Sequence, residues 1–177
     1  IDGNQDNNSL SDSGAVYVFT RNDSQWSQQA YVKASNTGNE DRFGSSIALF
    51  NSTLAVGAPG EDSNATGIDG NQGNNSLIDA GAAYLFTRND SQWRQQVYLK
   101  ASNTGNNDRF GSSIALFDSS LAVGAPGEDS NAAGIDGNQD NNSLSDSGAV
   151  YAYTRNNSQW GQQAYIKASN TGDSDLF

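Results

Sequence analysis

The chain has 177 residues, enough for one domain with a buried core, and its formal net charge is -11. It contains no Cys and no His, which excludes disulfides, thiolate metal sites and the commonest general base. The acidic balance argues against nucleic acid and anionic membranes as partners, and no apolar run approaches the ~20 residues that a membrane helix needs.

The chain repeats itself with a period of 67 residues. The pentapeptide IDGNQ begins at Ile1, Ile68 and Ile135. Residues 1–67 are identical to residues 68–134 at 55 of 67 positions. Self-similarity at a long, fixed period is typical of architectures built from repeated structural units.

Each unit contains four short segments of strand-like composition. In chain order, the first unit has GAVYVFTR at 14–21, QQAYVKAS at 28–35, FGSSIALF at 43–50 and TLAVGAP at 53–59. The runs AVYVF and IALF are apolar at consecutive positions, which predicts strands buried on both faces. QQAYVKAS alternates and predicts an outer, half-exposed strand. No segment has a sustained 3.6-residue period, so we expect essentially no helix.

Four strands in each repeated unit predict an all-β fold, a β-propeller of four-stranded antiparallel blades. A parallel β-helix is the alternative, although its repeats are usually much shorter. We divide the chain into a partial blade with the third and fourth strands at 1–42, full blades at 43–109 and 110–176, and the start of another unit at Phe177.

These segments amount to about two and a half blades, whereas a closed propeller needs at least about four. We therefore expect an excerpt of a larger propeller, in which the same longer chain supplies the further blades. The alternative is an oligomer in which other copies of the chain supply them.

The segments FGSSIALF, LAVGAPGEDSNA and GAVYVF resemble the FG-GAP repeat family, which builds the propeller of integrin α-subunits. Phe-Gly pairs at 43–44 and 110–111 and Gly-Ala-Pro triplets at 57–59 and 124–126 occur in register. The units look most similar to tandem FG-GAP repeats of secreted or surface bacterial proteins. The resemblance implies cell adhesion, an extracellular or cell-surface location, and a ligand-facing position for the loop that joins the second and third strands.

Three long loops are strongly acidic, because residues 1–13, 60–80 and 127–147 hold 12 of the 20 acids and no Lys or Arg. Alternating Asp and Asn oxygens are hard ligands of the kind that Ca²⁺ prefers. The alternative is a solvated loop whose Asp and Asn side chains make local backbone bonds. The candidate calcium ligands are Asp2, Asn4, Asp6, Asp12, Glu61, Asp62, Asp69, Asn71, Asp79, Glu128, Asp129, Asp136, Asn138, Asp140 and Asp146.

Two features of the resemblance and the repeat argue against calcium. Calcium-binding members of the FG-GAP family carry a DxDxDG loop between the first two strands, and here that connection is only residues 50–53. In the middle acidic loop, Gly73 stands where the other copies have an Asp.

Aromatic and charged side chains also recur once per unit. Trp26, Trp93 and Trp160 stand just before the outer strand, and we predict that they pack between blades, the alternative being a sugar-stacking platform. The repeated Arg, Lys and Asp residues are predicted to form blade-to-blade ion pairs of small energetic value. They are Arg21, Arg88 and Arg155, Lys33, Lys100 and Lys167, and Asp41, Asp108 and Asp175.

The sequence predicts a binding protein rather than an enzyme, because nothing activates its serines and its acids recur in every unit. The first hypothesis is adhesion, with a protein or glycan ligand held at the acidic loop face by weak contacts that add as avidity, and Ca²⁺ as a candidate cofactor. The alternatives are a structural spacer in a larger surface protein or filament, and a carbohydrate-binding, lectin-like propeller.

Overall fold

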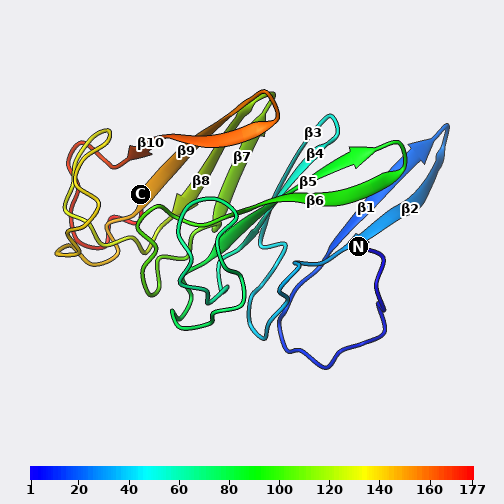
Figure 1. Cartoon of the computed structure of the whole chain (residues 1–177), viewed down its shortest axis with the longest axis horizontal. Helices are drawn as coiled ribbons and strands as arrows, with labels where there is room; N and C mark the ends of the chain where they lie inside the picture. The colour runs from blue at the N-terminus through cyan, green and yellow to red at the C-terminus, as the bar shows by residue number, and fades with distance from the viewer.

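The computed structural model describes residues 1–177, and its regular elements are ten β-strands in three antiparallel sheets (Figure 1). The first sheet pairs β1 (Val16–Asn22) with β2 (Gln25–Val32). The second sheet contains β3 (Ser46–Phe50), β4 (Thr53–Ala58), β5 (Ala82–Asn89) and β6 (Gln92–Leu99). The third sheet contains β7 (Ser113–Phe117), β8 (Ser120–Ala125), β9 (Ala149–Asn156) and β10 (Gln159–Ile166).

Each four-stranded sheet is a meander in which every strand pairs with its neighbour in the sequence. The sheets stand side by side, with the long loops gathered at one end and the short hairpins at the other (Figure 1). We call these ends the loop face and the hairpin end. The prediction of an all-β chain built from incomplete propeller blades is confirmed, and no helix that could cross a membrane is present.

The strand positions agree with the sequence pattern, but two boundaries differ. The tryptophans lie inside the outer strands β2, β6 and β10 rather than before them, because those strands continue to the hairpin turn. The Phe-Gly pairs precede β3 and β7, because Phe43 and Phe110 form isolated bridges with Gly14 and Gly81 of the preceding sheet. The Phe-Gly pair therefore connects one blade to the next.

Burial on the strands departs from the expected pattern in three places. β1, which carries most of AVYVF, is buried on one face only, and Tyr17 and Phe19 are exposed because no sheet covers the other face. The outer strand is not half-exposed along its whole length, because Tyr98 and Lys100 are completely buried beneath the loop and the neighbouring sheet. The IALF strands are not buried on both faces, and Ile47 and Leu49 are exposed. The innermost strands instead contact each other, with the rings of Phe50 and Phe117 4.9 Å apart. By contrast, β5 is buried on both faces from Ala82 to Phe86, as expected.

Two apolar clusters fill the seams, by which we mean the interfaces between consecutive sheets. In the first seam, Phe43 packs edge-on against Tyr84 and Phe86, at ring separations of 5.4 and 6.0 Å. In the second seam, Phe110 packs in the same way against two tyrosines of β9. Burying one Phe side chain stabilises a fold by about 1.5–3 kcal/mol, so these rings fix each blade to the one before it.

The glycines of the two motifs allow the inner strands to approach closely. A Cβ atom on Gly57 would lie 2.0 Å from the carbonyl oxygen of Gly111, which also accepts a hydrogen bond of 2.7 Å from the Ser46 hydroxyl. Gly111 has a φ of +91°, a conformation that favours glycine. The Gly of one Gly-Ala-Pro triplet therefore meets the Gly of the next Phe-Gly pair across the seam.

We predict that Gly57→Ala destabilises the chain by about 1–3 kcal/mol, because the added methyl group forces backbone apart in a packed seam. Urea unfolding followed by circular dichroism measures the change. The matched control is Gly161→Ala on an outer strand, where the nearest atom to an added Cβ is 3.7 Å away. Equal midpoints for the two variants would contradict the close approach.

Candidate functional site

A buried ion pair lies under each complete loop. Glu61 begins the long loop after β4, and Lys100 directly follows β6. The Lys100 ammonium donates to Glu61 Oε2 at 2.8 Å, and both side chains are only 1% exposed. The next blade repeats the arrangement with Glu128 and Lys167 at 2.6 Å. Burial lowers the pKa of Lys100, and the negative charge of Glu61 opposes that change.

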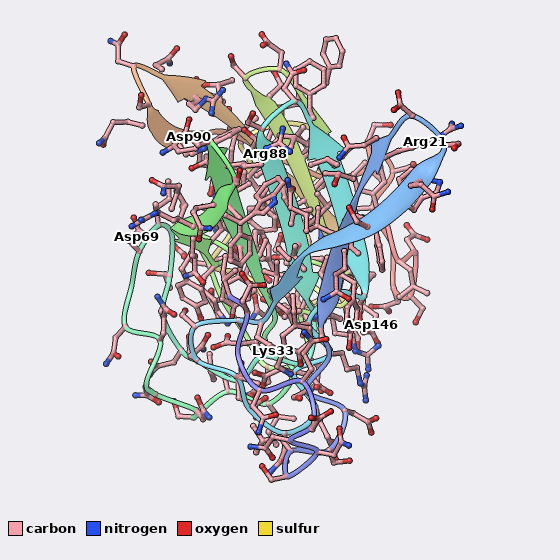
Figure 2. All side chains as sticks on the ribbon, turned by 90° about the vertical axis from the view of Figure 1, so that its right-hand side faces the viewer. Arg21, Lys33, Asp69, Arg88, Asp90 and Asp146 are labelled. Atoms are coloured by element: carbon pink, nitrogen blue, oxygen red, sulfur yellow. The ribbon has the colours of Figure 1, made fainter.

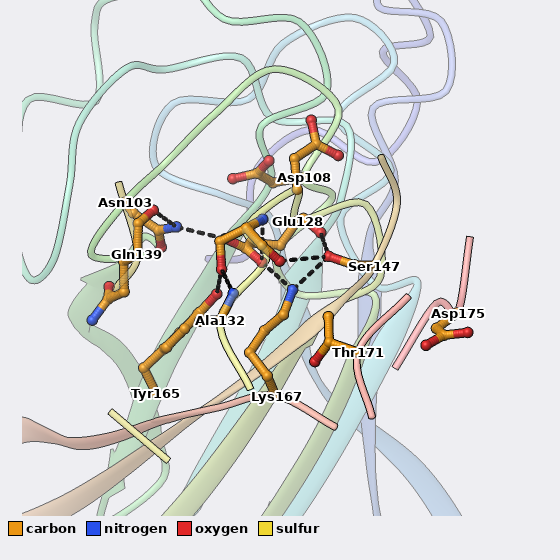
Figure 3. Close-up of polar contacts among 12 residues, drawn as sticks. Asn103, Asp108, Glu128, Ala132, Gln139, Ser147, Tyr165, Lys167, Thr171 and Asp175 are labelled. Atoms are coloured by element: carbon orange, nitrogen blue, oxygen red, sulfur yellow. Dashed lines mark hydrogen bonds and ion pairs between the residues drawn. The ribbon is translucent and has the colours of Figure 1, made fainter. Parts of the chain in front are cut away.

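The same glutamates hold the preceding blade. The Asn36 amide donates to Glu61 Oε1 at 2.8 Å, and the Tyr84 hydroxyl donates to the Asn36 oxygen at 2.7 Å. The second seam has the same chain of bonds through Asn103, Glu128 and Tyr151. Figure 3 shows how Glu128 lies between Asn103 on one side and Lys167 on the other. Each glutamate therefore connects the loop, the outer strand and the neighbouring blade.

The predicted blade-to-blade ion pairs do not form. The structure has two salt bridges, both within a blade, and neither involves an Asp or an Arg. The sequence pattern placed the lysines on an exposed strand face, whereas the loop covers the end of β6 and directs Lys100 inward. The glutamates were not expected to be its partners, because 39 residues separate Glu61 from Lys100.

A second carboxylate is buried at each seam. Asp108 is 3% exposed, and its Oδ2 accepts a hydrogen bond of 2.7 Å from the Gly105 N–H. The pKa of Asp108 is raised to about 7, mainly by burial and with a smaller contribution from the charges of Glu128 and Asp129, while the Gly105 hydrogen bond opposes the change. Burial likewise raises the pKa of Asp41, the equivalent residue of the first seam, to about 6. Each seam thus contains an acid that titrates near neutral pH.

The candidate calcium ligands are used mainly for bonds to backbone. Asp69 Oδ1 accepts from the Tyr98 N–H at 2.9 Å, while the Asp69 N–H donates to the Tyr98 carbonyl at 2.8 Å. Asp2 and Asp136 make the same pair of bonds with the tyrosines of their own outer strands. Asp62 and Asp129 each accept from the N–H of the Asp that ends their loop, namely Asp79 and Asp146. These acids close the loop onto its blade.

The remaining candidates make short local bonds or none. Asn4, Asn71 and Asn138 accept from the backbone N–H two residues further on, as in the Asx-turn alternative. Asp12, like Asp79 and Asp146, has positive φ, and its carbonyl accepts from the N–H of Arg42 in the next connection. The side chains of Asp6 and Asp140 are exposed and accept no hydrogen bond within the chain.

This arrangement does not fit a calcium site. No three acidic side chains gather in a group that could hold a metal ion, whereas Ca²⁺ needs six to eight oxygens around one point. Calcium binding stays a prediction from the sequence, and we derive no role for the ion.

The three tryptophans have different environments. Trp93 is 4% exposed and its indole N–H donates to Gln29 of the first sheet at 3.0 Å, which confirms packing between blades at this position. The guanidinium of Arg88 lies 5.8 Å from the centre of its ring. Trp160 is half-buried, and Trp26 is 67% exposed on the uncovered face of the first sheet.

Removing one partner of the buried ion pair should be strongly destabilising, because the other charge then stays in a dry site. We expect Lys100→Met to cost about 3–5 kcal/mol in urea unfolding. The double variant Glu61→Leu with Lys100→Met should recover a large part of that loss. Lys33→Met is the control for loss of the charge itself, because the half-exposed Lys33 has no glutamate partner. A single variant no less stable than the double variant would contradict the pairing.

We predict that stability falls as the pH rises from about 4 to about 7. A carboxyl whose pKa is about 7 in the folded chain and about 3.9 in the unfolded chain stabilises the fold while protonated. That contribution is present in acid and is lost as the pH rises through the folded pKa.

Asp108→Asn keeps an oxygen for the Gly105 N–H and carries no charge, so it should flatten this dependence and raise stability at pH 8. The midpoints of urea unfolding at several pH values measure how the stability of each variant depends on pH. Asp175→Asn is the matched control, because the exposed Asp175 makes the equivalent bond to the Gly172 N–H. An unchanged pH profile in Asp108→Asn would be inconsistent with the buried titration.

Comparison with known families agrees with the motifs. A family model described as the FG-GAP repeat matches residues 26–86 and 93–153, which is more than half of the chain. A search of the curated proteins gave no match. Each matched segment begins at an outer strand and ends on the third strand of the next blade, and so includes one complete seam crossing. The chain therefore belongs to the FG-GAP repeat family.

Proposed function

We propose that the chain is a non-enzymatic binding segment of a β-propeller, which presents repeated acidic loops to a partner outside the cell. The observation that carries the proposal is that the long loops are fixed in place on one face. Within the second blade, the Leu77 and Gly81 N–H groups donate to the carbonyls of Asp62 and Glu61. Asn36 of the preceding connection also donates to the carbonyl of Gln72 at 3.2 Å.

Fixed loops favour binding because the partner does not have to order them. Freezing a flexible loop costs free energy that is subtracted from the affinity. A loop already held by its own blade and by the preceding one avoids that cost. Successive blades display the same loop, so weak contacts to a repetitive partner add as avidity.

The charge of the loop face suits a partner with basic or hydrogen-bonding groups, whether a protein or a glycan. Asp6 and Asp140 are exposed there with free carboxylates, and the loops contain no Lys or Arg. Arg42 and Arg109 are exposed on the adjacent short connections, so positive charges border the acidic loops on the side of the inner strands. Figure 2 shows the loops at one end of the molecule and Arg21 and Asp90 at the opposite end.

The remaining elements of the proposal rest on the family and on composition. Adhesion and an extracellular or bacterial cell-surface location are proposed from the similarity to FG-GAP repeats of surface proteins. The absence of catalysis is proposed because the chain has no His or Cys and its buried glutamates are engaged by lysine and asparagine. Further blades, from the same longer chain or from other copies, would cover the apolar faces of the first and third sheets.

A structural spacer is the second candidate, and one observation favours it. Most of the loop acids close the loops or join the seams, and few are free to meet a partner. A lectin that stacks sugars on its tryptophans has less support, because Trp93 is buried in a seam.

Neutralising the free loop acids should weaken binding while leaving the fold intact. We expect the double variant Asp6→Asn, Asp140→Asn to bind several-fold more weakly to whichever purified extracellular-matrix protein or glycan the full chain recognises in a surface plasmon resonance panel. Binding should also weaken with added salt, because exposed charges are screened.

Asp23→Asn with Asp90→Asn is the matched control, since it makes the same charge change at exposed hairpin turns. Equal weakening by both pairs of substitutions would show that net charge, not the loop face, determines binding. No binding to any member of the panel would favour the spacer.

A further inference from the structure

A cavity lies between the second and third sheets, away from the buried ion pairs. Its volume is about 540 Å³, and its walls include Arg88, Gln96, Arg155 and Trp160. It extends from the outer strand β6, beside Asp69, to the hairpin turns at residues 51–53 and 158–159. In Figure 2, Arg88 lies toward the hairpin end and Asp69 lies at the outer side of the sheet. The volume is in the range of small-ligand sites.

At the equivalent place in the first seam, the side chains are bonded to one another. There the Gln29 side-chain oxygen accepts from the Trp93 indole N–H at 3.0 Å and from the Arg88 guanidinium at 3.3 Å. The corresponding residues in the second seam are Gln96, Arg155 and Trp160. No hydrogen bond joins them, and all three line the cavity. The same set of side chains is therefore joined by hydrogen bonds in one seam and left without them in the other.

The facing surfaces of the two seams differ in size at positions near this point. Val97, which lines the cavity, stands where the first sheet has Ala30, and Leu85 stands where it has Val18. In a closely packed interface, even one additional methylene group changes how the neighbouring side chains pack. The bonded side chains of the first seam thus lie near smaller neighbours than the unbonded side chains of the second.

The Arg155 guanidinium in the cavity wall has no ion-pair partner within the chain. Arg88 also borders the cavity, but its guanidinium donates to Gln29 and lies over Trp93 in the first seam. The Arg155 guanidinium makes no hydrogen bond and lies 5.6 Å from the centre of the Trp160 ring. Arginine matches a carboxylate with two parallel hydrogen bonds, so an anionic group is the natural partner for this wall.

The other residues that line the cavity indicate the chemistry of the rest of the ligand. They carry amides and hydroxyls from Asn51, Thr53, Thr87 and Gln96, which suit a molecule rich in hydroxyl groups. The carboxylate of Asp69 also lines the cavity, so it can accept from a hydroxyl but would repel a doubly charged anion. We propose that this cavity binds an acidic saccharide, with a uronate carboxylate on the Arg155 guanidinium and its hydroxyls on the amides. The site does not include Asp6 and Asp140, the free acids of the loop face.

Isothermal titration of the full chain tests this assignment, with a glucuronate-containing disaccharide, a neutral disaccharide of equal size and sodium sulfate as probes. We expect the acidic disaccharide to bind at least about tenfold more tightly than the other two, because Arg155 adds charge-assisted bonds. In the ¹⁵N NMR spectrum, the Trp160 indole N–H should shift on titration and the Trp26 indole N–H should not.

Arg155→Gln should weaken binding at least about tenfold, whereas Arg21→Gln, the equivalent change on the uncovered first sheet, should leave it unchanged. Trp160→Phe, which removes the indole N–H and shortens the ring at the wall, should also weaken binding, and urea midpoints confirm that each variant is folded. Equal affinity for the neutral disaccharide, equal or tighter binding of sulfate, equal effects of the two arginine substitutions, or no binding would each overturn the proposal.

Discussion

The buried glutamate–lysine pair is the interaction on which the blades depend. Removing two charges from water is costly, and the pair is stable only because its remaining atoms are also satisfied. Glu61 receives hydrogen bonds from Lys100, from the Ser63 N–H and from Asn36. These donors belong to the outer strand, the loop and the preceding connection, which the pair therefore holds at one point. The order of the loop face, and hence any binding there, follows from this buried contact.

The seams form because a single sheet cannot bury its own apolar faces. A four-stranded blade is apolar on both faces and cannot bury either of them alone, so its stability comes from its neighbours. Phe43 and Phe110 seal successive seams, and the meeting of Gly57 with Gly111 allows the inner strands to approach. Identical motifs nevertheless leave freedom at the outer strands, where Trp93 is bonded to the preceding sheet and Trp160 is not. In this chain, the blades are alike at their inner strands and differ at their outer strands.

The architecture could be predicted from the sequence, but the buried site could not. Runs such as AVYVF and the 67-residue period report local strand propensity and burial, which is why the strands and their grouping into blades were predictable. Period-2 alternation could not show that Lys100 turns inward, because its partner is distant in the chain and a buried lysine resembles an exposed one in sequence. The Asp and Asn spacing suggested metal ligands, but the same side chains serve equally well as backbone acceptors, as Asp69 does for Tyr98. The recurrence of Glu in every GAPGEDSNA segment was the available signal for the buried pair.

The ion pair also bridges two sequence repeats, since Glu61 belongs to the unit that starts at Ile1 and Lys100 to the unit that starts at Ile68. Every unit therefore supplies a glutamate to the lysine of the unit that follows it. If recombination removed or duplicated a stretch of 67 residues, the new neighbours would still present a glutamate and a lysine at the same separation. Such an array can change its length in whole blades without leaving a buried charge unpaired. A deletion that removed one member of a pair and kept the other would leave a buried charge unpaired, so the electrostatics of the core would select against it.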